Sequence, residues 1–81
     1  MSIAQKTANN IVTQLGQYRL LATTSVEAKQ IGTTAAERSR FNRKVCKLVD
    51  QEIGWRKIKT LTLANIDDET VSVSCVTEPR T

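Results

Sequence analysis

The residues of this chain with the clearest capacity for chemistry are arginines and lysines that recur at helical spacing. Arg40, Arg43 and Lys47 follow Ala36 at steps of four, three and four residues, and Lys44 lies on the border of the same row. Residues three or four apart share one face of an α-helix, so the cations are predicted to form a stripe. Guanidinium and ammonium groups bind phosphate oxygens, and Arg can also bond a guanine edge bidentately. The pattern predicts binding to a polyanion.

The charge of the chain is concentrated in one segment. The total net charge is +4, with a net +6 in residues 38–59 and a net −2 in the rest of the sequence. A basic patch on a slightly acidic body suits a polyanionic partner. An ordinary solvated helix face is the alternative for Arg40, Arg43 and Lys47 taken alone, and the sequence leaves it open.

Other kinds of site have little support. There is no His, and Cys46 and Cys75 stand far apart with no further ligands at zinc-site spacing, so we expect no metal, no cofactor and no catalytic site. One Phe, one Trp and one Tyr are too few for a base-stacking sheet. The cysteines are expected as free thiols in a reducing cytoplasm, with a disulfide between them left open.

No apolar run approaches the roughly 20 residues that span a bilayer, and no signal peptide is apparent, so we expect a cytoplasmic protein without membrane contact.

The elements that must position the basic stripe begin with an amphipathic helix. Apolar residues recur at spacings of three and four from residue 3 to residue 15, with Ser2 as a predicted N-cap and Gly16 as the stop. A homodimer is one hypothesis, and Ile3, Ile11 and Leu15 of this helix would supply its surface. The next stretch, "QYRLLATT", is interpreted as a short extended piece.

A short helix and a long helix are predicted next, separated by a single glycine. Ser25 is the predicted N-cap of the short helix "VEAKQI", which should end at Gly32. Thr34 and Glu37 fit a capping box at the start of the long helix. That helix is expected to run to about residue 53, with Phe41, Val45, Leu48 and Val49 facing the core.

After Gly54 the hydrophobic period changes to two. "WRKIKTLTLA" and "TVSVSCV" alternate as strands do, and the polar turn "NIDDE" between them has the length that closes a hairpin. The predicted fold is therefore α+β, with three helices followed by an antiparallel β-hairpin. Residues 1–81 are expected to form one domain, with residues 77–81 as a flexible tail.

The stretches "SVEAKQIG", "TTAAERSRFNRKVCKLV" and "GWRKIKTLTLANIDDETVSV" together resemble the winged helix-turn-helix family over nearly the whole chain. The resemblance implies a third helix in the DNA major groove and a hairpin, the wing, on the neighbouring backbone or minor groove. It implies that Thr33, Thr34 and Ala36 lie where the recognition helix enters the groove. From the residue types themselves we expect Arg40 and Arg43 to contact the groove. We expect the phosphate contacts to come from Lys44, Lys47, Arg56, Lys57 and Lys59.

The resemblance predicts a small double-stranded DNA-binding protein that regulates transcription, replication or recombination, of the compact kind found in phages and mobile elements. The hairpin tip departs from this pattern, because Asp67, Asp68 and Glu69 would be repelled by phosphates. Two other hypotheses therefore stay open. The chain could be a protein-protein interaction module, such as a phage accessory protein or inhibitor, that binds its partner through the acidic tip. It could also bind double-stranded RNA or the ribosome through the basic face.

Overall fold

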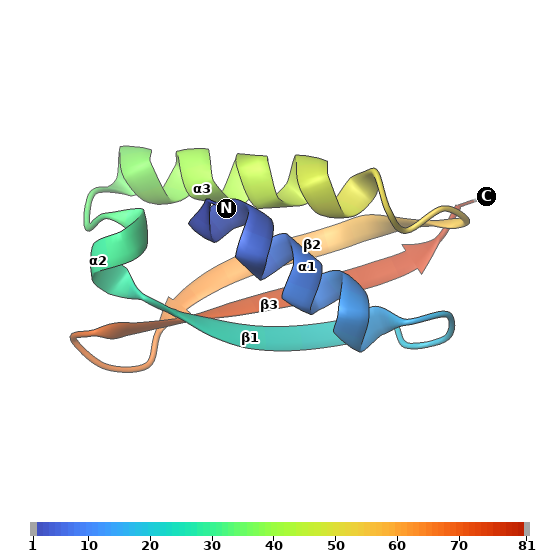
Figure 1. The fold of residues 1–81 in the computed structure, drawn as a ribbon, viewed down its shortest axis with the longest axis horizontal. Helices are drawn as coiled ribbons and strands as arrows, with labels where there is room; N and C mark the ends of the chain where they lie inside the picture. The colour runs from blue at the N-terminus through green and yellow to red at the C-terminus, as the bar shows by residue number, and fades with distance from the viewer. Residues whose placement is uncertain (1, 81) are drawn as a thin grey trace.

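Two long helices lie on one face of a three-stranded antiparallel sheet (Figure 1). The structure is a computed structural model and describes residues 2–80. The strands lie in the order β1-β3-β2, so the last strand of the chain is in the middle. The expected α+β class is confirmed. In chain order the elements are α1 (Ile3–Leu15), β1 (Leu21–Glu27), α2 (Ala28–Ile31), α3 (Ala35–Asp50), β2 (Arg56–Asn65) and β3 (Thr70–Pro79).

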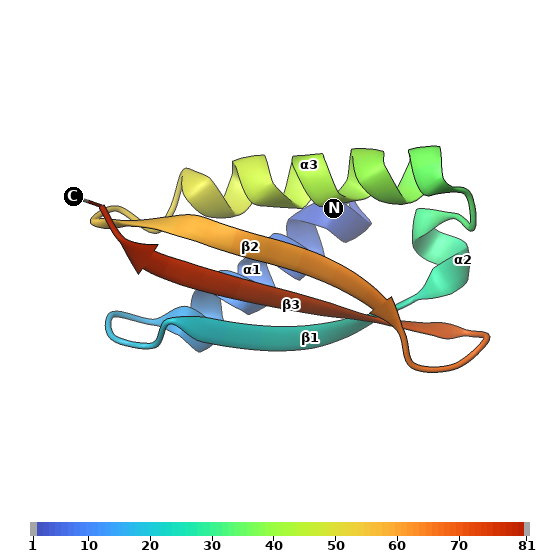
Figure 2. The same cartoon turned by 180° about the vertical axis from the view of Figure 1, so that it is seen from behind.

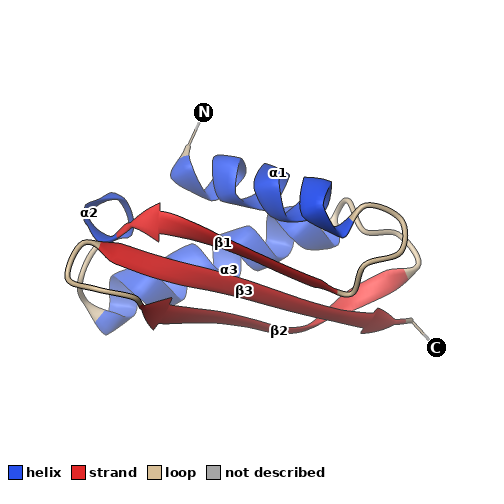
Figure 3. Cartoon of the chain, turned by 90° about the horizontal axis from the view of Figure 1, so that it is seen from below, coloured by secondary structure: helices blue, strands red, loops and turns tan. Residues whose placement is uncertain are grey.

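The core lies between the helices and the sheet. Seen from below, the strands lie in front of α3 while α1 lies alongside β1, and no helix covers the near face of the sheet (Figure 3). The central strand follows this division, because Val71, Val73 and Cys75 are fully buried while Ser72 and Ser74 alternate with them and are partly exposed. This period of two is the pattern expected for a sheet with one buried face.

The first helix has the predicted ends. The Ser2 side chain accepts a hydrogen bond from the Gln5 amide, and Gly16 terminates the helix at a positive φ of 51°. The proposed dimer surface on this helix is wrong, however. Ile11 and Leu15 are fully buried against the sheet and α3, so they form part of the core instead of an exposed contact surface.

The boundary between β1 and α2 differs from the prediction. Ser25 does not cap a helix but lies in β1, where it pairs with Ser72, and the strand continues to Glu27. Helix α2 is a single turn that begins at Ala28. Pairing with β3 buries Ala22 and Val26, and this tertiary gain overrides the weak local preference for an N-cap at Ser25. The short extended piece is therefore a full edge strand, and the hairpin belongs to a three-stranded sheet.

Helix α3 begins as predicted and ends early. The Thr34 hydroxyl accepts from the Glu37 amide at 3.1 Å and donates to the Glu37 carboxylate at 2.8 Å. The helix ends at Asp50 instead of near Ile53. Ile53 is buried in the core, so the chain must leave the helix axis to insert it, and Gly54 then turns the chain with a φ of 60°.

The hairpin is confirmed, and the flexible tail is wrong for the residues that are described. Strand β3 continues to Pro79, and the Thr77 amide donates to the Leu20 carbonyl at 2.7 Å. The Arg80 guanidinium lies 2.9 Å from the Asp50 carboxylate. These contacts attach the end of β3 to β1 and to α3; Thr81, the last residue of the predicted tail, lies outside the described residues. No helix within residues 2–80 is long and apolar enough to cross a membrane.

Candidate nucleic-acid interface

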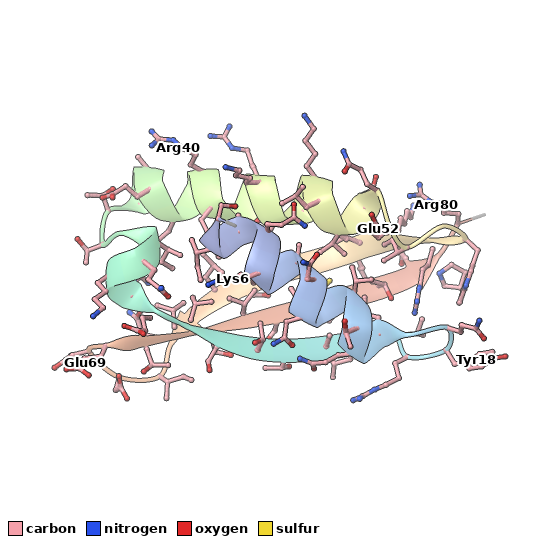
Figure 4. All side chains as sticks on the ribbon, viewed as in Figure 1. Lys6, Tyr18, Arg40, Glu52, Glu69 and Arg80 are labelled. Atoms are coloured by element: carbon pink, nitrogen blue, oxygen red, sulfur yellow. The ribbon has the colours of Figure 1, made fainter. Side chains whose placement is uncertain are left out.

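The exposed side of α3 carries the predicted cations. Phe41, Val45 and Val49 are buried and fix the opposite side of the helix against α1 and the sheet. Figure 4 shows the Arg40 side chain pointing away from the sheet. We define the basic face as four exposed side chains of this helix: Arg40, Arg43, Lys44 and Lys47.

The charge of the basic face is not compensated by nearby acids. Among residues 2–80, ion pairs within 4.0 Å are formed by Lys29 with Glu27, Lys57 with Glu78, and Arg80 with Asp50. None of them involves the basic face. A row of exposed like charges destabilises a helix slightly, and an anionic partner would relieve this repulsion.

Strand β2 adds one further cation beside this helix. The register between β2 and β3 shifts between Ile58 and Thr60, which leaves Lys59 without a cross-strand partner at a β-bulge. Lys59 and Lys47 line the same shallow pocket between β2 and the C-terminal half of α3. The structure therefore places Lys59 beside Lys47 of the basic face.

A second shallow pocket continues along the junction of α3 and β2, and its neutral polar residues Ser39 and Asn42 were not predicted as site residues. It is lined by Arg38, Ser39, Asn42 and Arg43 of the helix and by strand residues that include Leu61. The Asn42 amide donates to the Leu61 carbonyl at 2.7 Å. Asn42 lies between the apolar and basic sides of the helical wheel, and this border position was the only signal for it in the sequence.

Arg38 is partly buried at the edge of the core. Its guanidinium donates to the Asn65 side chain at 2.7 Å and to the Gly32 carbonyl at 3.4 Å. Both partners are neutral, so the charge of Arg38 stays available at the edge of the pocket next to Arg43.

The prediction that Arg56 contacts phosphate is wrong. Its side chain is 3% exposed and donates to the backbone carbonyls of Gly16 and Arg19, where α1 ends. It also lies over the Trp55 ring, 5.0 Å from the ring centroid. Arg56 is the inward-facing residue at the start of β2, and the sequence pattern did not separate it from its exposed neighbour Lys57. Lys57 in turn is paired with Glu78 at 3.6 Å, so its charge is partly compensated.

The N-terminus of α3 presents the three remaining predicted residues. Thr33, Thr34 and Ala36 are exposed there, but the Thr34 hydroxyl is already engaged with Glu37 as donor and acceptor. The Glu37 carboxylate also compensates the positive end of the helix dipole. This end of α3 is thus less suited to an anion than the basic face.

The acidic hairpin tip lies at the same end of the molecule as the N-terminus of α3, but next to the sheet (Figure 1). The Asp67 carboxylate accepts the amides of Glu69 and Thr70 at 2.8 and 2.9 Å, and these bonds lower its pKa. The Glu69 carbonyl accepts the Ala28 amide at 2.7 Å, which attaches the tip to α2. The basic face points away from the sheet and so away from these carboxylates.

Comparisons of the chain with known protein families, with curated proteins and with solved structures found no match. In residues 2–80, no group of three or more Cys, Asp or Glu side chains is arranged to hold a metal ion. Cys46 is partly buried and Cys75 fully buried, and both are free thiols. A function must therefore be inferred from the geometry of the protein. Its most distinct chemical feature is the basic face, whose cations form no ion pair among the described residues.

Proposed function

We propose that this protein binds double-stranded DNA through the exposed side of α3, as a small winged helix-turn-helix protein that regulates transcription, replication or recombination. The observation that carries the proposal is the basic face, a row of four exposed cations without carboxylate partners among the described residues. An α-helix fits the major groove of B-DNA, so a continuous row on one helix can reach both base edges and phosphates.

The order of the elements supports the winged-helix part of the proposal. The one-turn helix α2 is joined to α3 through residues 32–34, as in a helix-turn-helix pair, and a strand precedes this pair. The β2–β3 hairpin follows α3 and packs beneath it, which is where a wing would lie (Figure 2). In this interpretation α3 is the recognition helix, and Lys59 is the residue of the wing that contacts DNA.

The cations have two roles in this proposal. Arg40 and Arg43 are the candidates for base edges, since Arg can bond guanine O6 and N7 together. Lys44, Lys47 and Lys59 would bind phosphates and supply affinity without sequence information. If four to five phosphates are neutralised, the slope of log affinity against log salt is about −4, because each contact contributes about −0.9.

The test is a binding titration of a fluorescent random duplex over a series of salt concentrations. We expect binding at low salt and a decline of about two orders of magnitude between about 50 and 200 mM salt. A double-stranded RNA of the same length, measured in parallel, tests the RNA hypothesis. Absence of duplex binding at low salt would contradict the proposal.

A protein-protein interaction module is the second candidate function, and the hairpin tip favours it. Ile66 is 61% exposed there and is followed by three carboxylates. An exposed apolar side chain beside charges of one sign suits a protein surface better than a nucleic acid. This candidate predicts that replacement of Ile66 and Asp68 abolishes binding to the partner protein. The four cations of the basic face would be dispensable for that binding.

A further inference from the structure

The exposed apolar side chains gather at the two ends of the molecule. In residues 2–80 there are five large exposed ones, and the Cα positions extend 37 Å along the longest axis. Four of them belong to the end where β1 begins and α3 ends, and the fifth belongs to the hairpin tip at the opposite end (Figures 1 and 4). The exposed fractions at the first end are 85% for Tyr18, 43% for Leu20, 51% for Leu21 and 52% for Trp55; Ile66 at the tip is 61% exposed.

The first end is a fixed surface built from two loops. Arg56 donates to the Gly16 and Arg19 carbonyls of the α1–β1 loop and lies over Trp55 of the α3–β2 loop, so one buried guanidinium joins both. Thr77 adds two bonds to the Leu20 carbonyl, from its amide at 2.7 Å and its hydroxyl at 3.1 Å. We define the aromatic end as Tyr18, Arg19, Leu20, Leu21 and Trp55.

The aromatic end carries an excess of positive charge. The Arg80–Asp50 and Lys57–Glu78 pairs nearby are internally compensated. Arg19 is exposed and Arg56 is buried, and neither has a carboxylate within ion-pair distance among the described residues. Among residues 2–80, the one acid at this end without an ion-pair partner is Glu52 (Figure 4), so the exposed Arg19 and the buried Arg56 outnumber the free carboxylates there by one.

The opposite end has the complementary composition. We define the acidic tip as Ile66, Asp67, Asp68 and Glu69. The turn is held by the Asp67 carboxylate and by the Ile66 amide, which donates to the Thr70 carbonyl at 2.9 Å. Asp68 and Glu69 follow Ile66 in this turn, are exposed, and have no ion-pair partner in the part of the chain that the structure describes.

We propose that the protein associates head to tail, with the acidic tip of one copy docked on the aromatic end of the next. Ile66 would bury its side chain against Tyr18 and Trp55, while Asp68 and Glu69 would approach Arg19. Tyr, Trp and Arg are the residue types that dominate binding energy at protein interfaces, and charges of opposite sign orient the two partners. The two surfaces lie at opposite ends of the long axis, so the contact is heterologous and each added copy leaves a free tip and a free aromatic end.

Such a row would also arrange the basic faces. Helix α3 runs along the long axis of the molecule (Figure 1), so every copy in the row carries its cations along the direction of growth. A row of copies would coat a DNA duplex cooperatively. Only this consequence depends on the proposed DNA binding. The self-association is independent of it and can be measured without nucleic acid.

Two variants with exposed substitutions separate the two halves of the contact. The first, Tyr18→Ser with Arg19→Glu, damages the aromatic end and leaves the tip intact. The second, Ile66→Ser with Asp68→Lys, damages the tip and leaves the aromatic end and the Asp67 turn intact. Lys6→Glu, on the exposed side of α1, is the control for a change of charge elsewhere. Circular dichroism checks that all variants are folded.

Sedimentation velocity over a range of protein concentrations is the measurement. We expect the average mass of the wild-type protein and of Lys6→Glu to rise beyond that of a dimer, and the two double variants to lose at least about tenfold in association constant. A mixture of the two variants should form a 1:1 dimer that grows no further, because one intact tip meets one intact aromatic end.

Four results would overturn the proposal. If the wild-type protein stays monomeric at all concentrations, the two ends do not bind each other, and any contact they make is with other proteins. A dimer formed by the tip variant alone would indicate a two-fold contact between aromatic ends, and a dimer formed by the aromatic-end variant alone would indicate a contact between tips. A mixture that stays monomeric would equally contradict the head-to-tail contact.

Discussion

The side-chain amide of Asn42 donates a 2.7 Å hydrogen bond to the backbone carbonyl of Leu61. Leu61 lies in the edge strand β2, and an edge strand has backbone groups that no neighbouring strand pairs and that are open to solvent or to another strand. The Gln14 side chain does the same on the other edge strand, where it accepts the Thr23 amide at 3.2 Å. Each long helix thus uses one amide side chain to cover a sheet edge.

Removal of the Asn42 amide should loosen α3 from the hairpin. We expect Asn42→Ala to lower the free energy of unfolding by about 1 kcal/mol, the usual net contribution of one such hydrogen bond. Asn42→Asp should cost at least as much, because a carboxylate cannot donate to the carbonyl. Urea unfolding followed by circular dichroism measures both, with exposed Gln17→Ala as the control. A change no larger than that of the control would contradict this role.

Arg56 should be a determinant of stability and not of ligand binding. Its buried guanidinium satisfies two carbonyls at the end of α1, so Arg56→Ala leaves both unpaired and should cost about 2–4 kcal/mol. Lys57→Ala is the neighbouring control, and its exposed pair should contribute about 1 kcal/mol at most. Chemical denaturation compares the two variants. If Lys57→Ala were the more damaging, the assignment of the inward side chain in β2 would be wrong.

Two glycines with positive φ, Gly32 and Gly54, should respond differently to substitution. Gly32 has a φ of 97°, and a Cβ there would come within 2.1 Å of the Glu37 carboxylate; Gly54 has a φ of 60° and open space around it. Gly54→Asn should cost less than about 1 kcal/mol, because Asn tolerates the left-handed region. Gly32→Asn should cost more than about 1 kcal/mol and weaken the α2–α3 turn. Equal midpoints in thermal unfolding would contradict this difference.

The Cys75 thiol should make stability depend on alkaline pH. Burial, with a smaller effect of the nearby Cys46, raises its pKa from 9.0 to about 11, although Arg56 acts in the opposite direction. Because the folded-state pKa is above the unfolded one, the stability is full below pH 9 and falls as the pH rises towards 11. At pH 10 we expect a loss on the order of 1 kcal/mol. Urea unfolding in a reductant at pH 8 and pH 10 should show this loss, and Cys75→Ala should remove it.

Local signals in the sequence were sufficient to predict most of the helices and turns. Ser2 and Thr34 act as caps because side-chain hydrogen bonds to nearby amides depend only on neighbouring residues, and the Glu37 carboxylate supports the second cap by accepting the Thr34 hydroxyl. The basic face was predictable for the same reason, since helical spacing alone brings its members together. The hairpin followed from its alternation and its polar turn.

The features that depend on distant parts of the chain were not predictable. The extension of β1 through Ser25 requires its partner Ser72 in β3, and no local preference encodes that pairing. The burial of Arg56 depends on carbonyls 37 and 40 residues away. A buried arginine and an exposed one look alike in sequence, so one predicted phosphate contact became a support for the loops of the aromatic end.

The most direct test of DNA binding compares two variants that each remove two exposed charges. Lys44→Ala with Lys47→Ala acts on the basic face, and Lys6→Ala with Lys29→Ala acts elsewhere. The measurement is fluorescence anisotropy of a random duplex over a salt series. We predict that the basic-face variant loses about two units of salt slope while the control keeps the wild-type slope, because each lost phosphate contact removes about 0.9. Equal slopes in the two variants would contradict the proposal that this protein binds DNA through α3.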